Sequence, residues 1–244
     1  MIVRTEDAWA CAGVSAGPFT FICEHASARI PLPLTTTISD RIWLQTHWGF
    51  DIGALGLTTE LARHTHSQAI LARFSRLLCD ANRHRNHPDL IRETIDGVSL
   101  SFNAGLDEAE VIRRVELYHE PYHRAIDAAL SAAGSQTFLI SVHSFTPIWD
   151  QKLRTMDIGI LFDGTEGATR DARKLQDAIE EEGFFTALNE PYSGISNLMY
   201  AADRHGRHHQ VRRLELELNQ AIICTPERVL RVGERIARAL QKLI

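Results

Sequence analysis

Three residues that could take part in acid–base or metal chemistry lie where predicted β-strands end. His25 follows the apolar run 18–23, His143 follows 137–142, and Glu217 lies near the end of the alternating segment 211–218. In open α/β sheets, ligands bind in the crevice beyond the carboxyl ends of the strands. Distant parts of the chain are therefore predicted to bring two imidazoles and one carboxylate to one place.

A second candidate group lies on a helix predicted to begin at residue 39 or 40 and to end near residue 64. His47 and Asp51 are four residues apart, so on a helix both would project from one face. Such a pair can hold a metal ion, or the carboxylate can orient the imidazole. An ordinary pair on a helix surface is the other interpretation. His119 and His123 repeat this spacing, with a proline between them that disfavours a regular helix.

The segment Asp80-Ala81-Asn82-Arg83 opens an irregular stretch over residues 81–105, which is longer than most connections and therefore hints at a functional loop. An arginine presents a rigid fork of donors to a carboxylate, and an asparagine can bind the same group or a developing oxyanion. The alternative is a solvated arginine beside an asparagine in a turn.

Composition limits the chemistry further. The 244 residues include twelve His and only four Cys, which are widely spaced and form no C-x-x-C motif. Any metal site must therefore use imidazole and carboxylate ligands. There is no G-x-S-x-G, G-x-G-x-x-G or G-x-x-x-x-G-K-[ST] motif, so serine-hydrolase and nucleotide chemistry have no support. A net charge of -5 without a basic tract argues against nucleic-acid binding.

Short apolar strands alternate with helical patterns along the whole chain. The expected strands are 18–23, 68–73, 76–80, 137–142, 157–162, 184–188 and 211–218, and the later helices are 107–133, 168–182, 197–205 and 226–243. This alternation predicts an α/β fold, a largely parallel sheet covered by helices on both faces, in a single domain over residues 1–244. No apolar run is long enough to span a membrane, and residues 1–15 lack a signal-peptide core, so a soluble cytoplasmic protein is expected.

An ordered set of blocks resembles the N-formylglutamate amidohydrolase family and covers about residues 20–225. The blocks are Cys23-Glu24-His25-Ala26 with Arg29-Ile30-Pro31, His47 with Asp51-Ile52-Gly53-Ala54, Asp80-Ala81-Asn82-Arg83, His119 to His123, Ser141 to Pro147, Asn189 to Gly194, and Glu215 to Gln220. Some of them are also similar to segments of zinc carboxypeptidases. These are the histidine strand end around His143, the Asn82-Arg83 pair, and Glu217-Leu218.

The resemblance implies a three-layer αβα fold of the phosphorylase/hydrolase-like, zinc carboxypeptidase-like kind, with a mostly parallel mixed sheet and one Zn²⁺ ion. His25, His143 and an acid would be the zinc ligands. Carboxypeptidases place a ligand glutamate three residues after the first histidine, where this chain has Ala28. We therefore expect Asp51 as the third ligand, with Glu24 as the alternative.

The resemblance also implies roles for the remaining site residues. Glu217 would be the general base, and Arg83 and Asn82 would bind the substrate carboxylate or the oxyanion. His123, Tyr192 and Ser193 would line the substrate pocket. His47 would orient Asp51 or touch the metal.

The expected reaction is hydrolysis of the N-formyl or other N-acyl amide of an acidic amino acid such as N-formylglutamate. Many family members have Glu-Ile-Arg-Gln in the late strand, whereas this chain has Asn219 at the arginine position, which leaves the substrate open. The alternatives are a peptidase or deacylase acting on another substrate, and a non-catalytic metal- or carboxylate-binding protein. The expected partner is a small N-acyl amino acid, with neither a nucleic acid nor a membrane, and the sequence does not indicate an oligomeric state.

Overall fold

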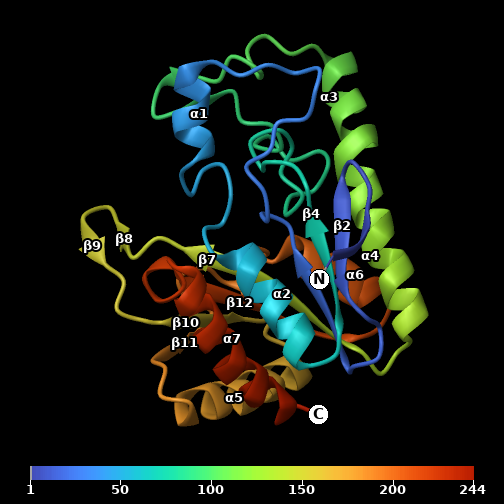
Figure 1. Cartoon of the computed structure of the whole chain (residues 1–244), viewed down its shortest axis with the longest axis vertical. Helices are drawn as coiled ribbons and strands as arrows, with labels where there is room; N and C mark the ends of the chain where they lie inside the picture. Colours follow the sequence, from blue (N-terminus) through green and yellow to red (C-terminus); the bar gives the residue numbers. More distant parts are fainter. Residues whose placement is uncertain (1) are drawn as a thin grey trace.

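The computed structural model describes residues 2–244 and is organised around one mixed sheet of eight strands (Figure 1). Their spatial order is β1 (Ile2–Thr5), β2 (Trp9–Gly13), β4 (Gln68–Ala72), β3 (Phe19–Cys23), β7 (Phe138–Phe145), β12 (Arg212–Asn219), β10 (Ile158–Leu161) and β11 (Thr186–Leu188). The four central strands, β4 to β12, run parallel, while β2 and β10 pair with them antiparallel. The mostly parallel mixed sheet expected from the sequence is confirmed.

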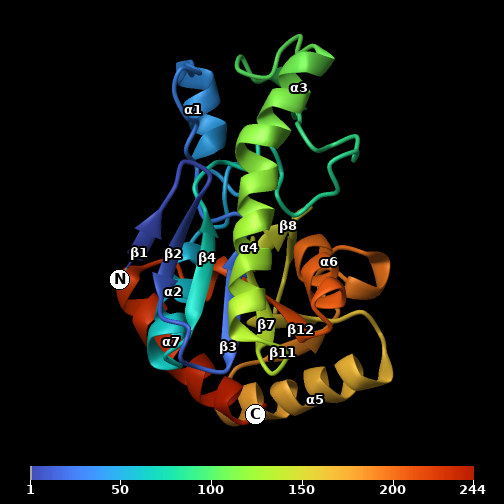
Figure 2. The same cartoon turned by 90° about the vertical axis from the view of Figure 1, so that its right-hand side faces the viewer.

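Helices cover both faces of this sheet (Figures 1 and 2). The helices on one face are α2 (Ala54–His64), α5 (Glu166–Glu181) and α7 (Pro226–Gln241). Those on the other are α4 (Glu120–Ala133) and α6 (Tyr200–His208). Among the described residues, no helix combines the length and the apolar character needed to cross a membrane.

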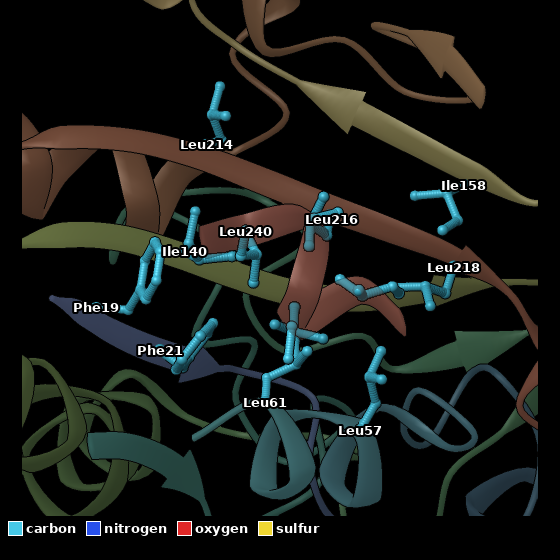
Figure 3. Packing of buried hydrophobic residues seen from close by; sticks show 14 of the residues in the cluster. Phe19, Phe21, Leu57, Leu61, Ile140, Ile158, Leu214, Leu216, Leu218 and Leu240 are labelled. Carbon is cyan, nitrogen blue, oxygen red and sulfur yellow. The ribbon is translucent and has the colours of Figure 1, made fainter. Parts of the chain in front are cut away.

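The alternation of residues in the central strands decides which face carries polar groups. In β12, Leu214, Leu216 and Leu218 join the core beneath α2 and α7, as Figure 3 shows. Successive side chains of a strand point to opposite faces, so Glu215 and Glu217 face the other way. In the parallel register, Glu217 pairs with His143 of β7. The Leu-Glu alternation therefore places these two polar groups side by side.

The prediction of a single helix from residue 39 or 40 to residue 64 is wrong. The structure has two helices, α1 (Ile38–Leu44) and α2, joined by an irregular segment that contains His47 and Asp51. Gly53, immediately before α2, has φ +82°, a left-handed conformation that suits glycine and interrupts the helix. His47 and Asp51 thus lie in a connection and do not share a helix face.

Two other expectations also need correction. Residues 76–80 form turns where a strand was predicted, and the predicted helix 107–133 is interrupted. It consists of α3 (Glu108–Arg114), one π-helical turn (Val115–His119) and α4. Pro121, which has no N–H to donate, occupies the first turn of α4, and the π-turn accommodates the break.

Several short elements were not predicted at all. In the edge hairpin β1–β2, strand β2 has only half-buried alternation, and the other short strands missed are two residues each. They form the hairpins β5 (Thr94–Ile95) with β6 (Val98–Ser99) and β8 (Ile148–Trp149) with β9 (Lys152–Leu153). The remaining short helices are 3₁₀ turns at Gly194–Ser196 and Gln220–Ile222.

Candidate metal and substrate site

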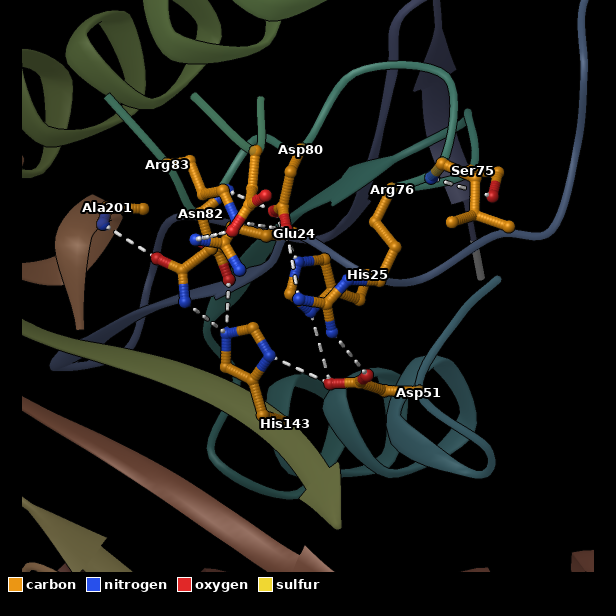
Figure 4. Close-up of polar contacts among 12 residues, drawn as sticks. Glu24, His25, Asp51, Ser75, Arg76, Asp80, Asn82, Arg83, His143 and Ala201 are labelled. Carbon is orange, nitrogen blue, oxygen red and sulfur yellow. Dashed lines mark hydrogen bonds and ion pairs between the residues drawn. The ribbon is translucent and has the colours of Figure 1, made fainter. Parts of the chain in front are cut away.

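The three residues predicted as metal ligands meet at the carboxyl end of the central strands (Figure 4). His25 follows β3, His143 lies near the end of β7, and Asp51 precedes α2; all three are buried. Each offers one ligand atom, and these atoms lie within 4.8 Å of one another. Asp51 Oδ2 is 2.8 Å from His143 Nδ1 and 3.4 Å from His25 Nδ1. The structure thus brings two imidazoles and one carboxylate together.

The far edge of each imidazole ring is held by a different carboxylate. His25 Nε2 lies 2.7 Å from Asp80 Oδ1, and His143 Nε2 lies 2.9 Å from Glu24 Oε2. These contacts leave both Nδ1 atoms directed at Asp51. Within residues 2–244, His25 Nδ1 has no hydrogen-bond partner although it is buried. Metal-binding histidines in proteins are typically held in this way, with the second nitrogen donating to a carboxylate. The donor set therefore fits a divalent metal ion.

Glu24, the alternative third ligand, occupies a different position from Asp51. Its Oε2 accepts a hydrogen bond from Ser141 Oγ at 2.8 Å and faces the far edge of His143. Asp51, by contrast, lies close to the Nδ1 atoms of both His25 and His143.

The electrostatics of this cluster favour a positive charge. Burial alone would lower the pKa of His143, but the charge of Glu215 and the hydrogen bonds to Asp51 and Glu24 hold it well above its usual range. For Asp51, burial alone would raise the pKa, but the charge of His25 and the hydrogen bond to His143 hold that pKa below its usual range. Ionised carboxylates around two imidazoles suit a cation.

Glu217 has the position expected of a proton acceptor. It lines the cavity beside the two histidines, and its Oε2 is buried with no hydrogen-bond partner in the described part of the chain. Burial raises its pKa to about 8, against the attraction of His143. A carboxylate that binds its proton more tightly is a stronger base when ionised. Glu215, two residues earlier on the same strand face, is also buried, with its Oε2 3.7 Å from His143 Nε2.

The Asp80–Arg83 segment is tied into the site by its own side chains. Asp80 accepts hydrogen bonds from Arg76 at 2.9 Å and from Arg83 Nε at 3.2 Å. Asn82 Oδ1 accepts from the backbone N–H of Ala201 at 2.9 Å, and its Nδ2 lies 3.4 Å from His143 Nε2. Arg83 and Asn82 both line the cavity, so their remaining donors can meet an anion there.

Not every predicted pocket residue reaches the cavity. Tyr192 lines it, whereas Ser193 is half-buried outside its wall. His123 is fully buried behind the Asp80–Arg83 segment, where its Nδ1 lies 2.7 Å from His205 Nε2. The Nδ1 atom of His205 in turn lies 2.7 Å from Asp127 Oδ1. His123 therefore supports the wall from behind and has no access to a ligand in the cavity.

Sequence reasoning missed several residues of this site. Glu215 shares a strand face with Glu217, and Arg76 is four residues before Asp80, so the spacing in both cases held a usable signal. The aromatic side chain of Trp149, which also lines the cavity, belongs to a two-residue strand without a detectable pattern.

A second trio of potential ligands, Asp127, His208 and His209, also has its ligand atoms within 4.8 Å of one another. It lies at the surface, with His208 exposed, and its residues do not line the cavity that contains Glu217 and Arg83. The buried trio is therefore the better candidate for chemistry.

The family model of N-formylglutamate amidohydrolase matches residues 17–224. No curated protein matches the chain. Among solved structures, gene product Atu2144 from Agrobacterium tumefaciens is 25% identical, with a TM-score of 0.83 over 97% of this chain and 96% of that one. N-formylglutamate amidohydrolase from Ralstonia eutropha JMP134 is 18% identical, with a TM-score of 0.71 over 98% of this chain and 100% of that one. A putative carboxypeptidase from Burkholderia mallei ATCC 23344 is 14% identical, with a TM-score of 0.49 over 96% of this chain and 59% of that one.

Proposed function

The chain belongs to the N-formylglutamate amidohydrolase family, and on that premise we propose that it is a metal-dependent enzyme. Its reaction would be hydrolysis of the N-formyl or other N-acyl amide of an acidic amino acid. The observation that carries this proposal is the buried trio His25, Asp51 and His143, in which two imidazole Nδ1 atoms and one carboxylate face a common point.

The trio would hold one Zn²⁺ ion. Three protein ligands leave one tetrahedral position open, as in catalytic zinc sites. When bound by the trio, the ion would polarise the amide carbonyl as a Lewis acid and lower the pKa of an adjacent water.

Glu217 would move the proton. Glu217 lines the cavity and its Oε2 has no hydrogen-bond partner among the described residues, so the carboxylate is free to accept a proton from the attacking water and pass it to the departing amine nitrogen. The water oxygen bonds to the carbonyl carbon, the C–N bond breaks, and the products are a carboxylic acid and an amino acid.

Arg83 and Asn82 would bind and orient the substrate. Arg83 is held by Asp80 and directs its other donors into the cavity, where a substrate carboxylate can pair with it. Asn82 adds an amide donor beside His143, where charge develops on the carbonyl oxygen. One such donor is typically worth about 3 kcal/mol of barrier.

The test combines metal analysis with a charge-removing variant. Protein purified without chelator is expected to contain close to one zinc ion per chain and to hydrolyse N-formyl- or N-acetylglutamate. Glu217→Gln should keep the metal and lower kcat by roughly a hundred- to ten-thousandfold. Glu190→Gln, the same substitution at an exposed position of the 189–193 segment, is the control and should retain activity.

Two results would contradict the proposal. One is metal-free protein whose activity survives His143→Ala. The other is wild-type protein that binds metal and N-acyl amino acids but turns neither over, which would favour the non-catalytic binding function.

A further inference from the structure

The cavity beside the trio has two unlike walls. It measures about 480 Å³, and part of its lining consists of the charged and imidazole side chains of Arg83, His84, His87, Asp89 and Arg92, the last of which lies 5.2 Å from the ring centroid of Trp48. A second part of the lining, which we call the aromatic wall, consists of Trp48, Phe145, Trp149 and Tyr192. These four rings line the same cavity as His25, Asp51, His143 and Glu217.

Contacts among the rings and with Arg154 hold the aromatic wall together. The Trp48 and Trp149 rings have centroids 6.5 Å apart. The guanidinium of Arg154 lies 5.5 Å from the Phe145 and Trp149 centroids and 5.6 Å from that of Tyr192. One cation stacked on three rings holds them in place.

Asn219 braces the segment that carries Arg154. Its side-chain amide donates to the backbone carbonyls of Arg154 at 3.3 Å and Met156 at 3.1 Å. The position of the stacked cation is therefore fixed by the end of β12, the strand that also carries Glu217.

Large apolar surfaces of this wall are left uncovered. Trp149 keeps 47% and Tyr192 36% of its surface exposed, although both belong to a packed cluster. Exposed apolar surface that is gathered at one place and rimmed by polar groups marks a binding site. Because these rings share a cavity with the trio, the ligand they fit is part of the molecule being hydrolysed.

The geometry also indicates which part of the substrate meets the aromatic wall. The His47 ring lies 5.1 Å from the Trp48 ring and 6.0 Å from the Trp149 ring, and the charge of Asp51 acts on the pKa of His47, so the aromatic wall lies near Asp51. Figure 4 shows Asn82 and Arg83 on the other side of the His25 and His143 rings. A substrate whose amino-acid carboxylate pairs with Arg83 therefore extends its acyl group across the trio toward the aromatic wall; this step rests on the proposed function.

We propose that the enzyme prefers N-acyl amino acids whose acyl group is bulky and apolar, above all one that carries an aromatic ring. A formyl group has no carbon beyond the carbonyl and would leave the aromatic wall uncovered. The cavity volume falls within the range of about 300–1,000 Å³ that is usual for drug-sized ligands. A ring stacked on Trp149 would remove apolar surface from water on both partners.

The first arm of the test compares kcat/KM of the metal-loaded enzyme for N-phenylacetylglutamate and N-acetylglutamate. The two substrates share the leaving group and have similarly reactive carbonyls, so their ratio reports on the acyl pocket. We expect the phenylacetyl substrate to be favoured by roughly tenfold or more. Trp149→Ala should lower this ratio about tenfold. Phe185→Ala removes an aromatic side chain that is 58% exposed outside the cavity, and it should leave the ratio unchanged.

The second arm measures binding without turnover. In metal-loaded Glu217→Gln protein, calorimetry should show N-phenylacetylglutamate binding about tenfold more tightly than N-acetylglutamate. The added substitution Trp149→Ala, or Tyr192→Ala as a second test of the same wall, should remove most of the difference.

The outcomes separate the two proposals. Hydrolysis of both substrates without a phenylacetyl preference overturns the acyl-group inference and leaves the amidohydrolase function standing. Tighter phenylacetyl binding that depends on Trp149, without any hydrolysis by the wild-type enzyme, supports the inference and overturns the function. If the wild-type protein hydrolyses neither substrate and the Glu217→Gln protein shows no selective binding, both proposals are overturned.

Discussion

Replacing Asp80 by asparagine should weaken metal binding by the trio without unfolding the protein. Asp80 is buried and lies 2.7 Å from His25 Nε2, with Arg76 at 2.9 Å and Arg83 at 3.2 Å. Burial works against its ionisation, but the charges of Arg76 and His25 hold the pKa of Asp80 well below its usual range. The residue is therefore a buried anion that sets which nitrogen of His25 faces Asp51.

The size of the effect follows from two changes. Asparagine has the same shape but no charge, so its bond to His25 is about half as strong as a charge-assisted one. Loss of such an outer carboxylate typically lowers metal affinity ten- to a hundredfold, or roughly 1.4 to 2.7 kcal/mol. In addition, Arg76 already lies 3.8 Å from Asp51, and without Asp80 it would compete with a metal ion for the Asp51 carboxylate.

The assay is a competition for zinc between the protein and a chromophoric chelator at fixed pH. Asp89→Asn is the matched control, because Asp89 belongs to the same loop and faces Arg83 at 4.0 Å and Arg92 at 3.6 Å from an exposed position. Thermal unfolding of both variants checks that they remain folded. A folded Asp80→Asn protein whose zinc affinity is within about threefold of the wild type would refute the role assigned to Asp80.

Two further predictions concern stability. Arg114 is fully buried and donates to Asn103 Oδ1 and to backbone carbonyls. Arg114→Met leaves these buried acceptors unpaired and should lower the free energy of unfolding in urea by about 1–3 kcal/mol; an unchanged free energy would contradict this. Burial opposes ionisation of Asp127, but hydrogen bonds from His205 and His209 lower its pKa from 3.8 to about 2. The contribution of the Asp127 carboxylate to stability is present above pH 4 and is lost as the pH falls through 2. At pH 6 the melting temperature of Asp127→Asn should therefore lie below that of the wild type. Equal melting temperatures at pH 6 would contradict this stabilising role of Asp127.

The parts of the fold that could be predicted are those in which one residue pattern determines both the local secondary structure and the tertiary contacts of that segment. The alternation of Leu214, Glu215, Leu216 and Glu217 reports a strand with one apolar face, and the same alternation presents both carboxylates to the site. Short apolar strands that end in polar residues therefore indicated both the sheet and the position of the candidate site.

The connection between α1 and α2 shows where local patterns fail. Its apolar spacing suits a helix, but the chain is held open by contacts that spacing does not encode. The N–H of Asp51 donates to the carbonyl of His25 at 2.9 Å, and Ser75 Oγ donates to the carbonyl of Gly49 at 2.7 Å. His47 and Asp51 still reach the cavity, for a different reason from the helical one that predicted their proximity.

The carboxylates around His143 depend on the order and register of strands, which no segment of sequence contains by itself. Ile22 of β3 pairs with Ser141 of β7, so Glu24, two residues further along, falls beside His143. On the other side, the register of β12 places Glu217 against His143. A slip of one residue would turn these side chains to the opposite face and bring apolar neighbours into the site. The leucines packed beneath α2 and α7 resist that slip, because a shifted strand would expose them. The positions of the candidate metal ligand and of the candidate base are therefore determined by the apolar face of the sheet as much as by the polar residues themselves.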